Sequence, residues 1–178
     1  FVVDFGSIIE QRDSSNNTTT VIADIRDTVS LNYNLTSSGF DFGKDTVIIV
    51  EMVLNYLPSA AVEELLSFLS RAFSIAGGLP ILICYDYFKL SENSAFSSVL
   101  LQKFRMRGAP LEHVPLNGAS QHDILKKTGW SNACVNSVGL TLSSFRKLNL
   151  ITNSVFARNA AENETAVFFD EYASLALL

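Results

Sequence analysis

Short apolar runs alternate along this chain with longer stretches in which apolar residues recur every three or four positions. The run 47–50 ends at Glu51, and its β-branched composition predicts a strand buried in the middle of a sheet with helices on either side. A second run, 79–85, ends at Asp86 and predicts another buried strand. Between the two runs, 58–76 has the periodicity of an amphipathic helix. Strand, helix and strand in succession predict an α/β fold with a mostly parallel sheet wound on both faces.

Shorter patterns predict the remaining elements. Ser59 is the expected cap of the helix in 58–76. A second amphipathic helix is expected at 93–107, with Lys103 and Arg107 facing outward. Its core-facing residues are expected to be Phe96, Val99, Leu100 and Phe104. The other expected elements are strands at 1–5, 20–23 and near 131–138, and helices at 7–12, 28–33, 120–128, 141–147 and from 167 onward.

Acidic residues follow the predicted strands. Asp4, Asp24 and Glu51 come after three of them, and Asp86 follows a fourth. Taken singly, each acid is explained as a strand-end or capping residue. Several carboxylates at one edge of a parallel sheet repel one another, and the carboxyl edge is where α/β proteins bind ligands. The repetition therefore predicts acids that hydrogen-bond the hydroxyls, amides or cationic group of a ligand.

Composition limits the class of protein. The chain has 178 residues, is 48% hydrophobic, and carries a formal charge of −5, which fits one compact domain and argues against general affinity for nucleic acid backbones. No apolar segment approaches the roughly 20 residues that span a bilayer, and no secretion leader is visible, so a cytoplasmic protein is expected. Cys84 and Cys134 are expected to be small buried hydrophobes, His113 and His122 surface residues, and Trp130 a core aromatic. No metal site is predicted.

Seven sequence blocks occur in an order and spacing typical of a known family. They are FVVDFGSII, VIADIRD, TVIIVEMVLNYLPSAAVEELL, ICYD, QKFRMRG, KKTGW and FFDEY. The most specific are D-x-R-D at 24–27 and E-x-V-L-x-Y at 51–56. Together these blocks resemble the leucine carboxyl methyltransferase family. The resemblance implies a Rossmann-like class I methyltransferase sheet with helices on both faces, and S-adenosyl-L-methionine as cofactor.

The resemblance also implies roles for particular residues. Asp4 would hold the ribose hydroxyls of the cofactor, while Asp24 and Ile25 would bracket its adenine. Glu51 would lie beside the methionine part, and Tyr56 would line the neighbouring substrate side. The implied reaction needs no general base, because a carboxylic acid with a pKa near 4 is already ionised at neutral pH.

Departures from the family pattern predict a fragment. This chain has Gly6 where proline is usual, Gln11-Arg12 in place of a basic pair, and Asp86 in place of glutamate. The family's glycine-rich loop and its strand would precede Phe1, and its last strand would follow Leu178. We therefore expect residues 1–178 to form a single, truncated methyltransferase domain.

Two methyl acceptors compete within the family. The first, which we expect, is the C-terminal leucine carboxylate of the protein phosphatase 2A catalytic subunit. The second is a carboxylate on a modified guanosine of tRNA in wybutosine synthesis. A third hypothesis, from another class, is a non-catalytic module that kept the fold and lost the cofactor; the missing glycine-rich loop favours it. A nucleotide-dependent oxidoreductase is disfavoured, because its glycine fingerprint is not visible.

Overall fold

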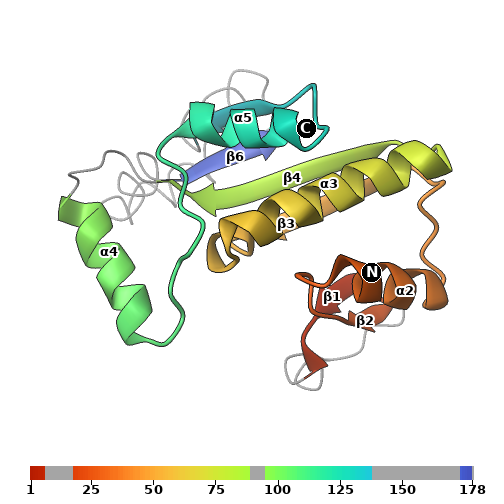
Figure 1. Cartoon of the computed structure of the whole chain (residues 1–178), viewed down its shortest axis with the longest axis horizontal. Helices are drawn as coiled ribbons and strands as arrows, with labels where there is room; N and C mark the ends of the chain where they lie inside the picture. Colours follow the sequence, from red (N-terminus) through yellow and green to blue (C-terminus); the bar gives the residue numbers. More distant parts are fainter. Residues whose placement is uncertain (7–17, 89–94, 138–172, 178) are drawn as a thin grey trace, which may run out of the picture.

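A computed structural model describes residues 1–6, 18–88, 95–137 and 173–177 of the chain (Figure 1). Its strands are β1 (Val2–Asp4), β2 (Thr20–Ile22), β3 (Thr46–Glu51), β4 (Pro80–Tyr87), β5 (Cys134–Ser137) and β6 (Ala173–Leu177). Its helices are α2 (Thr28–Ser37), the 3₁₀ turn η1 (Leu54–Tyr56), α3 (Ser59–Ala76), α4 (Ala95–Met106) and α5 (Gly118–Lys127). The helices predicted at 7–12 and 141–147 lie outside the described residues.

The strands form two separate sheets. In the first, β1 and β2 pair in parallel. The second has the order β3-β4-β6-β5, in which β3 and β4 are parallel and β6 runs antiparallel to both of its neighbours. A mixed α/β fold with parallel strand pairs is thereby confirmed.

The position of β3 corrects one expectation. We predicted a strand buried on both faces, but β3 is an edge strand of its sheet and its residues alternate between half-buried and exposed. Val47 and Ile49 are 56% and 73% exposed, on the side of the strand away from the core. Ile48 and Val50, on the other side of the strand, pack against the core. Helices on the second face remain a prediction.

Residues 173–177 correct two further expectations. We predicted a helix from 167, but Ala173–Leu177 is a strand. The sheet therefore contains a strand between β4 and β5 within the chain, where we expected the last strand only beyond Leu178. An apolar run of this length fits a strand or a helix, and pairing with two neighbours decided between them.

Helix α3 is the centre of the core. Its predicted apolar stripe is buried and comprises Val62, Leu65, Leu66, Leu69 and Phe73. The helix ends at Gly77, whose φ of 89° is the left-handed conformation that glycine adopts without steric cost. Trp130 is buried as predicted, and its Nε1 donates to the Leu66 carbonyl at 3.1 Å.

An aromatic cluster joins the two sheets. Phe42 and Phe73 meet edge to face with ring centroids 5.1 Å apart, and Phe40 contacts both of them. Phe1, beside β1, contacts Phe40 at 5.1 Å. Edge-to-face pairs at this spacing are favourable beyond the area they bury. The cluster thus connects the β1–β2 sheet to α3 and, through it, to the larger sheet.

Helix α4 differs from its predicted packing. Only Ser97 is fully buried on it, and Val99 is 52% exposed. The rings of Phe104 and Tyr56 meet edge to face with their centroids 6.2 Å apart. The Tyr87 hydroxyl donates to Ser97 Oγ at 2.9 Å. The expectation of a continuous core-facing stripe is therefore wrong for α4, which lies at the side of the molecule (Figure 1).

Candidate functional site

The ends of β1 and β3 open into one cavity of about 880 Å³. Asp4 from the end of β1, Ile25 from the turn after β2, and Glu51 from the end of β3 all line it. These residues are far apart in sequence and come from both sheets. Three of the four predicted cofactor-binding residues therefore share one cavity.

The backbone is strained next to Glu51. Met52 has φ of 56°, the left-handed region that non-glycine residues rarely adopt. Its N–H donates to the Tyr85 carbonyl at 2.7 Å, so the last ladder bond to β4 holds this conformation. Burial and the nearby Glu51 carboxylate both raise the pKa of the Tyr85 phenol. Strain of this kind is concentrated at functional sites, which agrees with a role for Glu51.

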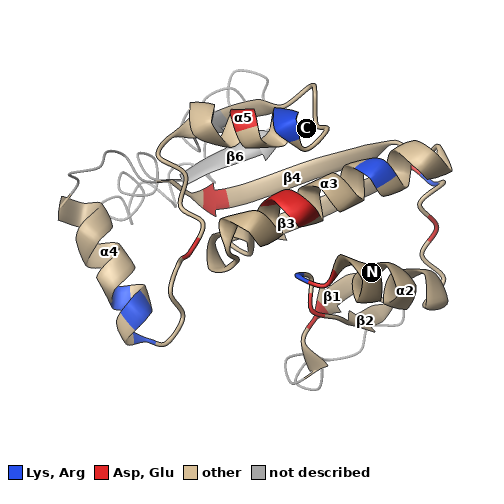
Figure 2. Cartoon of the chain, in the orientation of Figure 1, with Lys and Arg blue, Asp and Glu red and all other residues tan. Residues whose placement is uncertain are grey.

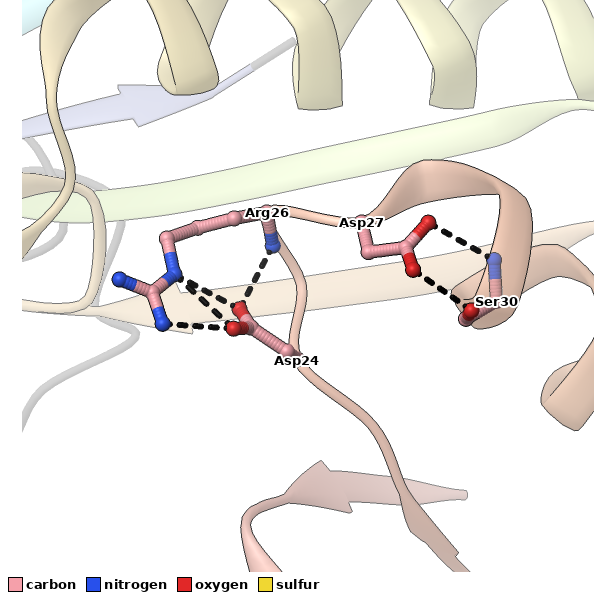
Figure 3. Close-up of polar contacts among 4 residues, drawn as sticks. All are labelled: Asp24, Arg26, Asp27 and Ser30. Atoms are coloured by element: carbon pink, nitrogen blue, oxygen red, sulfur yellow. Dashed lines mark hydrogen bonds and ion pairs between the residues drawn. The ribbon is translucent and has the colours of Figure 1, made fainter.

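The D-x-R-D block folds into two local structures (Figure 3). The Asp24 carboxylate accepts bonds from the guanidinium of Arg26 at 2.6 to 3.0 Å and from the Arg26 backbone N–H at 3.0 Å. Asp27 caps α2, accepting from Ser30 N–H at 3.1 Å and from Ser30 Oγ at 2.6 Å. The hydrogen bond from Arg26 lowers the pKa of Asp24, and that from Ser30 lowers the pKa of Asp27.

Asp24 is thus held by its own neighbour and does not line the cavity. Its expected contact with adenine remains a prediction. Arg26 was missed from sequence, although an acid and a base two residues apart are a recognisable signal for a local ion pair. This pair lies at the surface, where its contribution to stability is small.

Tyr56 lies outside the cavity as well. Its ring is 40% exposed and faces Phe104 of α4. The neighbouring Asn55 was missed from sequence and is fully buried. Asn55 Oδ1 accepts from Tyr87 N–H at 2.7 Å, and Nδ2 donates to the carbonyls of Tyr87 at 3.0 Å and His113 at 2.8 Å. A single amide side chain therefore joins η1, the end of β4 and the loop before α5.

His113 corrects the expectation of a surface histidine, because it is only 4% exposed. Nδ1 lies 3.1 Å from Ser59 Oγ and Nε2 lies 3.3 Å from Gln121 Oε1. Ser59 is consequently not the cap of α3: the N-cap position is Pro58, without a side-chain bond. Burial lowers the pKa of His113, which favours the neutral ring.

Asp86 is buried inside β4, not free at the edge of the sheet. Neither carboxylate oxygen makes a well-formed hydrogen bond within the described part of the chain. Burial raises the pKa of Asp86 to about 7, while the backbone N–H of Asn55 has a smaller lowering effect. Among the cysteines, Cys84 is buried as predicted and Cys134 is exposed, contrary to expectation.

The raised pKa of Asp86 predicts a pH-dependent stability. Above pH 4 the unfolded chain releases this proton, whereas the folded protein keeps it until about pH 7. The free energy of unfolding should therefore fall as pH rises through that window, by about 1 kcal/mol per pH unit between pH 5 and 7. Asp86→Asn removes this dependence, which urea unfolding at several pH values will measure. Asp123→Asn, an exposed acid on α5, should keep the wild-type slope.

Two features are absent from the described residues. No helix among them is long and apolar enough to cross a membrane. Among the same residues, no group of three or more histidine, cysteine, aspartate or glutamate side chains is placed to hold a metal ion.

The fold and cavity define an α/β protein with acidic residues at the ends of parallel strands. Residues 7–70 match the family model described as leucine carboxyl methyltransferase. Over 111 residues, 61% of its length, the chain is 29% identical to "tRNA wybutosine-synthesizing protein 4" of Rattus norvegicus. The chain spans 15% of the length of that relative. These matches confirm the resemblance to the leucine carboxyl methyltransferase family, a family of S-adenosylmethionine-dependent methyltransferases. The matched region includes Asp24, Ile25, Glu51 and Tyr56.

Proposed function

We propose that the protein of which this chain is part is an S-adenosylmethionine-dependent carboxyl O-methyltransferase. The observation that supports it best is the meeting of Asp4, Ile25 and Glu51 in one cavity, from three separate strand ends. The family match over residues 7–70 supports the same reaction class.

The side chains in this cavity suit the proposed cofactor. Carboxylates accept hydrogen bonds from ribose hydroxyls and from an amino group, and they stabilise nearby positive charge. Asp4 and Glu51 would serve in these two roles, and Ile25 offers an apolar side chain for the adenine face. When bound, S-adenosylmethionine supplies an electrophilic methyl group on a sulfonium.

The chain's own contribution would be orientation and exclusion of water. The acceptor carboxylate is already ionised at neutral pH, so no residue is needed as a general base. Alignment of the reacting groups at about 3 Å is worth about 7 to 11 kcal/mol in favourable cases. Neither of the buried side chains of His113 and Asp86 is required for a proton transfer in this proposal.

For the acceptor, we propose a carboxylate carried by tRNA or by a protein tail. The rat relative is named for wybutosine synthesis on tRNA, and this favours a tRNA acceptor over the protein phosphatase 2A tail that we expected from sequence. Three exposed cations at the end of α4, visible in Figure 2, offer a surface for an anionic acceptor; they are Lys103, Arg105 and Arg107. The assay is methyl transfer by the full-length protein to each acceptor in parallel.

Cofactor binding tests the proposal directly. Calorimetry with the full-length protein should show S-adenosylmethionine binding, and Glu51→Gln should weaken it by about 10- to 100-fold, because the amide replaces a charged acceptor. Glu64→Gln makes the same chemical change at an exposed position on α3 and should bind like the wild type. Unchanged binding in Glu51→Gln would remove Glu51 from the site, and no binding by the full-length protein would favour a non-catalytic module.

A further inference from the structure

Ser59, His113 and Gln121 form a hydrogen-bonded chain outside the candidate cofactor site. Ser59 Oγ lies 3.1 Å from Nδ1 of His113, and Nε2 of the same ring lies 3.3 Å from Gln121 Oε1. The three residues come from the start of α3, the loop before α5, and α5 itself. None of them lines the cavity that holds Asp4 and Glu51. A hydroxyl, an imidazole and an orienting oxygen in series are the components of a nucleophilic site.

The contact with Gln121 decides which nitrogen of the His113 ring carries the hydrogen. Burial lowers the pKa of His113, so the ring is neutral at neutral pH and has one N–H group. An amide oxygen can only accept, so Nε2 is the donor to Gln121 and Nδ1 keeps its lone pair. Ser59 Oγ–H therefore donates to Nδ1. The base beside Ser59 is in the form that general-base catalysis requires.

The backbone of His113 holds its ring in place. The His113 N–H donates to the Asn55 carbonyl at 3.2 Å, and the His113 carbonyl accepts from Asn55 Nδ2 at 2.8 Å. Asn55 belongs to η1, which ends three residues before Ser59. His113 is only 4% exposed, whereas Ser59 is exposed. A base fixed behind an accessible hydroxyl is already oriented for proton transfer.

The start of α3 supplies hydrogen-bond donors beside Ser59. The first intrahelical bond runs from Val62 N–H to the Pro58 carbonyl at 3.1 Å, so the N–H groups of residues 59–61 have no partner within the helix. The helix dipole adds partial positive charge at the same place. In acyl transfer, the backbone N–H of the residue after the nucleophile is a common donor to the oxyanion. Ala60 N–H is the corresponding group here.

Glu63, one turn along α3 from Ser59, places a negative charge near the ring. Its carboxylate raises the pKa of His113, although burial has the larger and opposite effect. The same charge would stabilise the imidazolium that forms when the ring takes the proton of Ser59. A carboxylate at this position also repels anionic substrates, so the surroundings of Ser59 favour a neutral one.

We propose that Ser59 is the nucleophile of a second reactive site, which takes small neutral carboxylic esters, with His113 as general base and Gln121 positioning the ring. Ser59 Oγ bonds to the acyl carbon as its proton passes to His113 Nδ1. The C–O bond to the leaving alcohol then breaks, and the alcohol takes that proton. Water attacks the acyl-serine in the same way and releases the acid. This inference does not depend on the proposed function, since its test involves neither S-adenosylmethionine nor a methyl acceptor.

The role of Gln121 is tested through the rate of acylation by p-nitrophenyl acetate in the full-length protein. Gln121→Met removes the acceptor for His113 Nε2 and should slow acylation about 10-fold or more. It also removes the buried Gln121 Nε2, which has no partner in the described part of the chain, so the urea midpoint should change little. Gln121→Glu keeps an acceptor and should keep the rate. A lower midpoint with an unchanged rate would give Gln121 a purely structural role.

Cysteine substitution gives a readout that does not require ester binding. Ser59→Cys places a thiol beside His113 Nδ1 and at a helix start, and both neighbours favour the thiolate. Iodoacetamide at pH 7 should alkylate this thiol at least about 10-fold faster than the one in Ser74→Cys, an exposed position near the other end of α3. Peptide mapping separates both from Cys84 and Cys134. Equal rates would show that His113 does not act as a base at position 59.

A burst of p-nitrophenolate tests the nucleophile itself. With p-nitrophenyl acetate, the full-length protein should release about one equivalent per chain before steady turnover, and peptide mapping should find the acetyl group on Ser59. Ser59→Ala should abolish the burst, and His113→Gln should slow it at least about 100-fold. Ser74→Ala should react like the wild type. The proposal is overturned if the wild type shows no burst, or if the burst survives in Ser59→Ala.

Discussion

Phe73→Ala is expected to lower the free energy of unfolding by about 3 to 5 kcal/mol. The Phe73 side chain is fully buried on α3 and meets Phe40 and Phe42 edge to face. Its removal loses the transfer free energy of the ring and these aromatic contacts, and leaves a void that the cluster cannot close without shifting. Because the cluster joins the two sheets, the β1–β2 region should lose protection against hydrogen exchange together with α3.

A matched substitution on the same helix separates packing from helix propensity. Ile75 is two residues further along α3 and 87% exposed, so Ile75→Ala should change the unfolding free energy by no more than about 0.5 kcal/mol. Urea unfolding followed by circular dichroism measures both variants. A decrease in the unfolding free energy of less than 1 kcal/mol for Phe73→Ala would show that this cluster is not a main source of core stability.

Asn55→Ala is expected to lower the free energy of unfolding by about 3 to 4 kcal/mol. This is a large effect for the substitution of a polar residue. The substitution removes the acceptor for the Tyr87 N–H and the donor to the carbonyls of Tyr87 and His113 in a buried site. Each unsatisfied buried group costs about 1 to 3 kcal/mol, partly relieved where water can enter. The chain segments joined by this side chain should also separate more readily.

Asn34→Ala is the control for this prediction. Asn34 on α2 is half-buried and donates one bond, to the Ile22 carbonyl at 3.0 Å, so its loss should cost about 1 kcal/mol. Asn55→Asp adds a second test, because it keeps the acceptor for Tyr87 N–H but loses both donors and brings a charge beside Asp86. We expect Asn55→Asp to be at least as damaging as Asn55→Ala above pH 7. Equal costs for Asn34→Ala and Asn55→Ala would contradict the proposed role of the buried amide.

The strands and their acids were predictable because they depend on local sequence. The apolar runs around Val50 and Leu82 are too short and too β-branched for helices, and each acid that follows them ends a strand or lies near its end. The stripe of α3 was equally clear, since five apolar residues recur at helical spacing. The strand at 173–177 was not predictable, because in so short a run the pairing with neighbours distant in sequence decides between strand and helix.

Burial of polar residues could not be predicted in the same way. Asn55 is a single polar residue between Leu54 and Tyr56, and only the meeting of η1, β4 and the loop before α5 encloses it together with His113. Asp86 was expected after the end of a strand, but it lies buried within β4, next to Asn55 of η1. The partners of Asn55, Tyr87 and His113, are 32 and 58 residues away along the chain, so no local pattern carries the signal.

By itself, the sequence determined the α/β class, the family resemblance and the acids that follow the parallel strands, because apolar periodicity and motif spacing are properties of neighbouring residues. Only the tertiary structure decided which acids meet. It brings Asp4 and Glu51 into one cavity with Ile25, leaves Asp24 with Arg26, and buries Asp86. The physical reason is that strand order and helix packing, which join distant segments, set which side chains share a space and which are shielded from water.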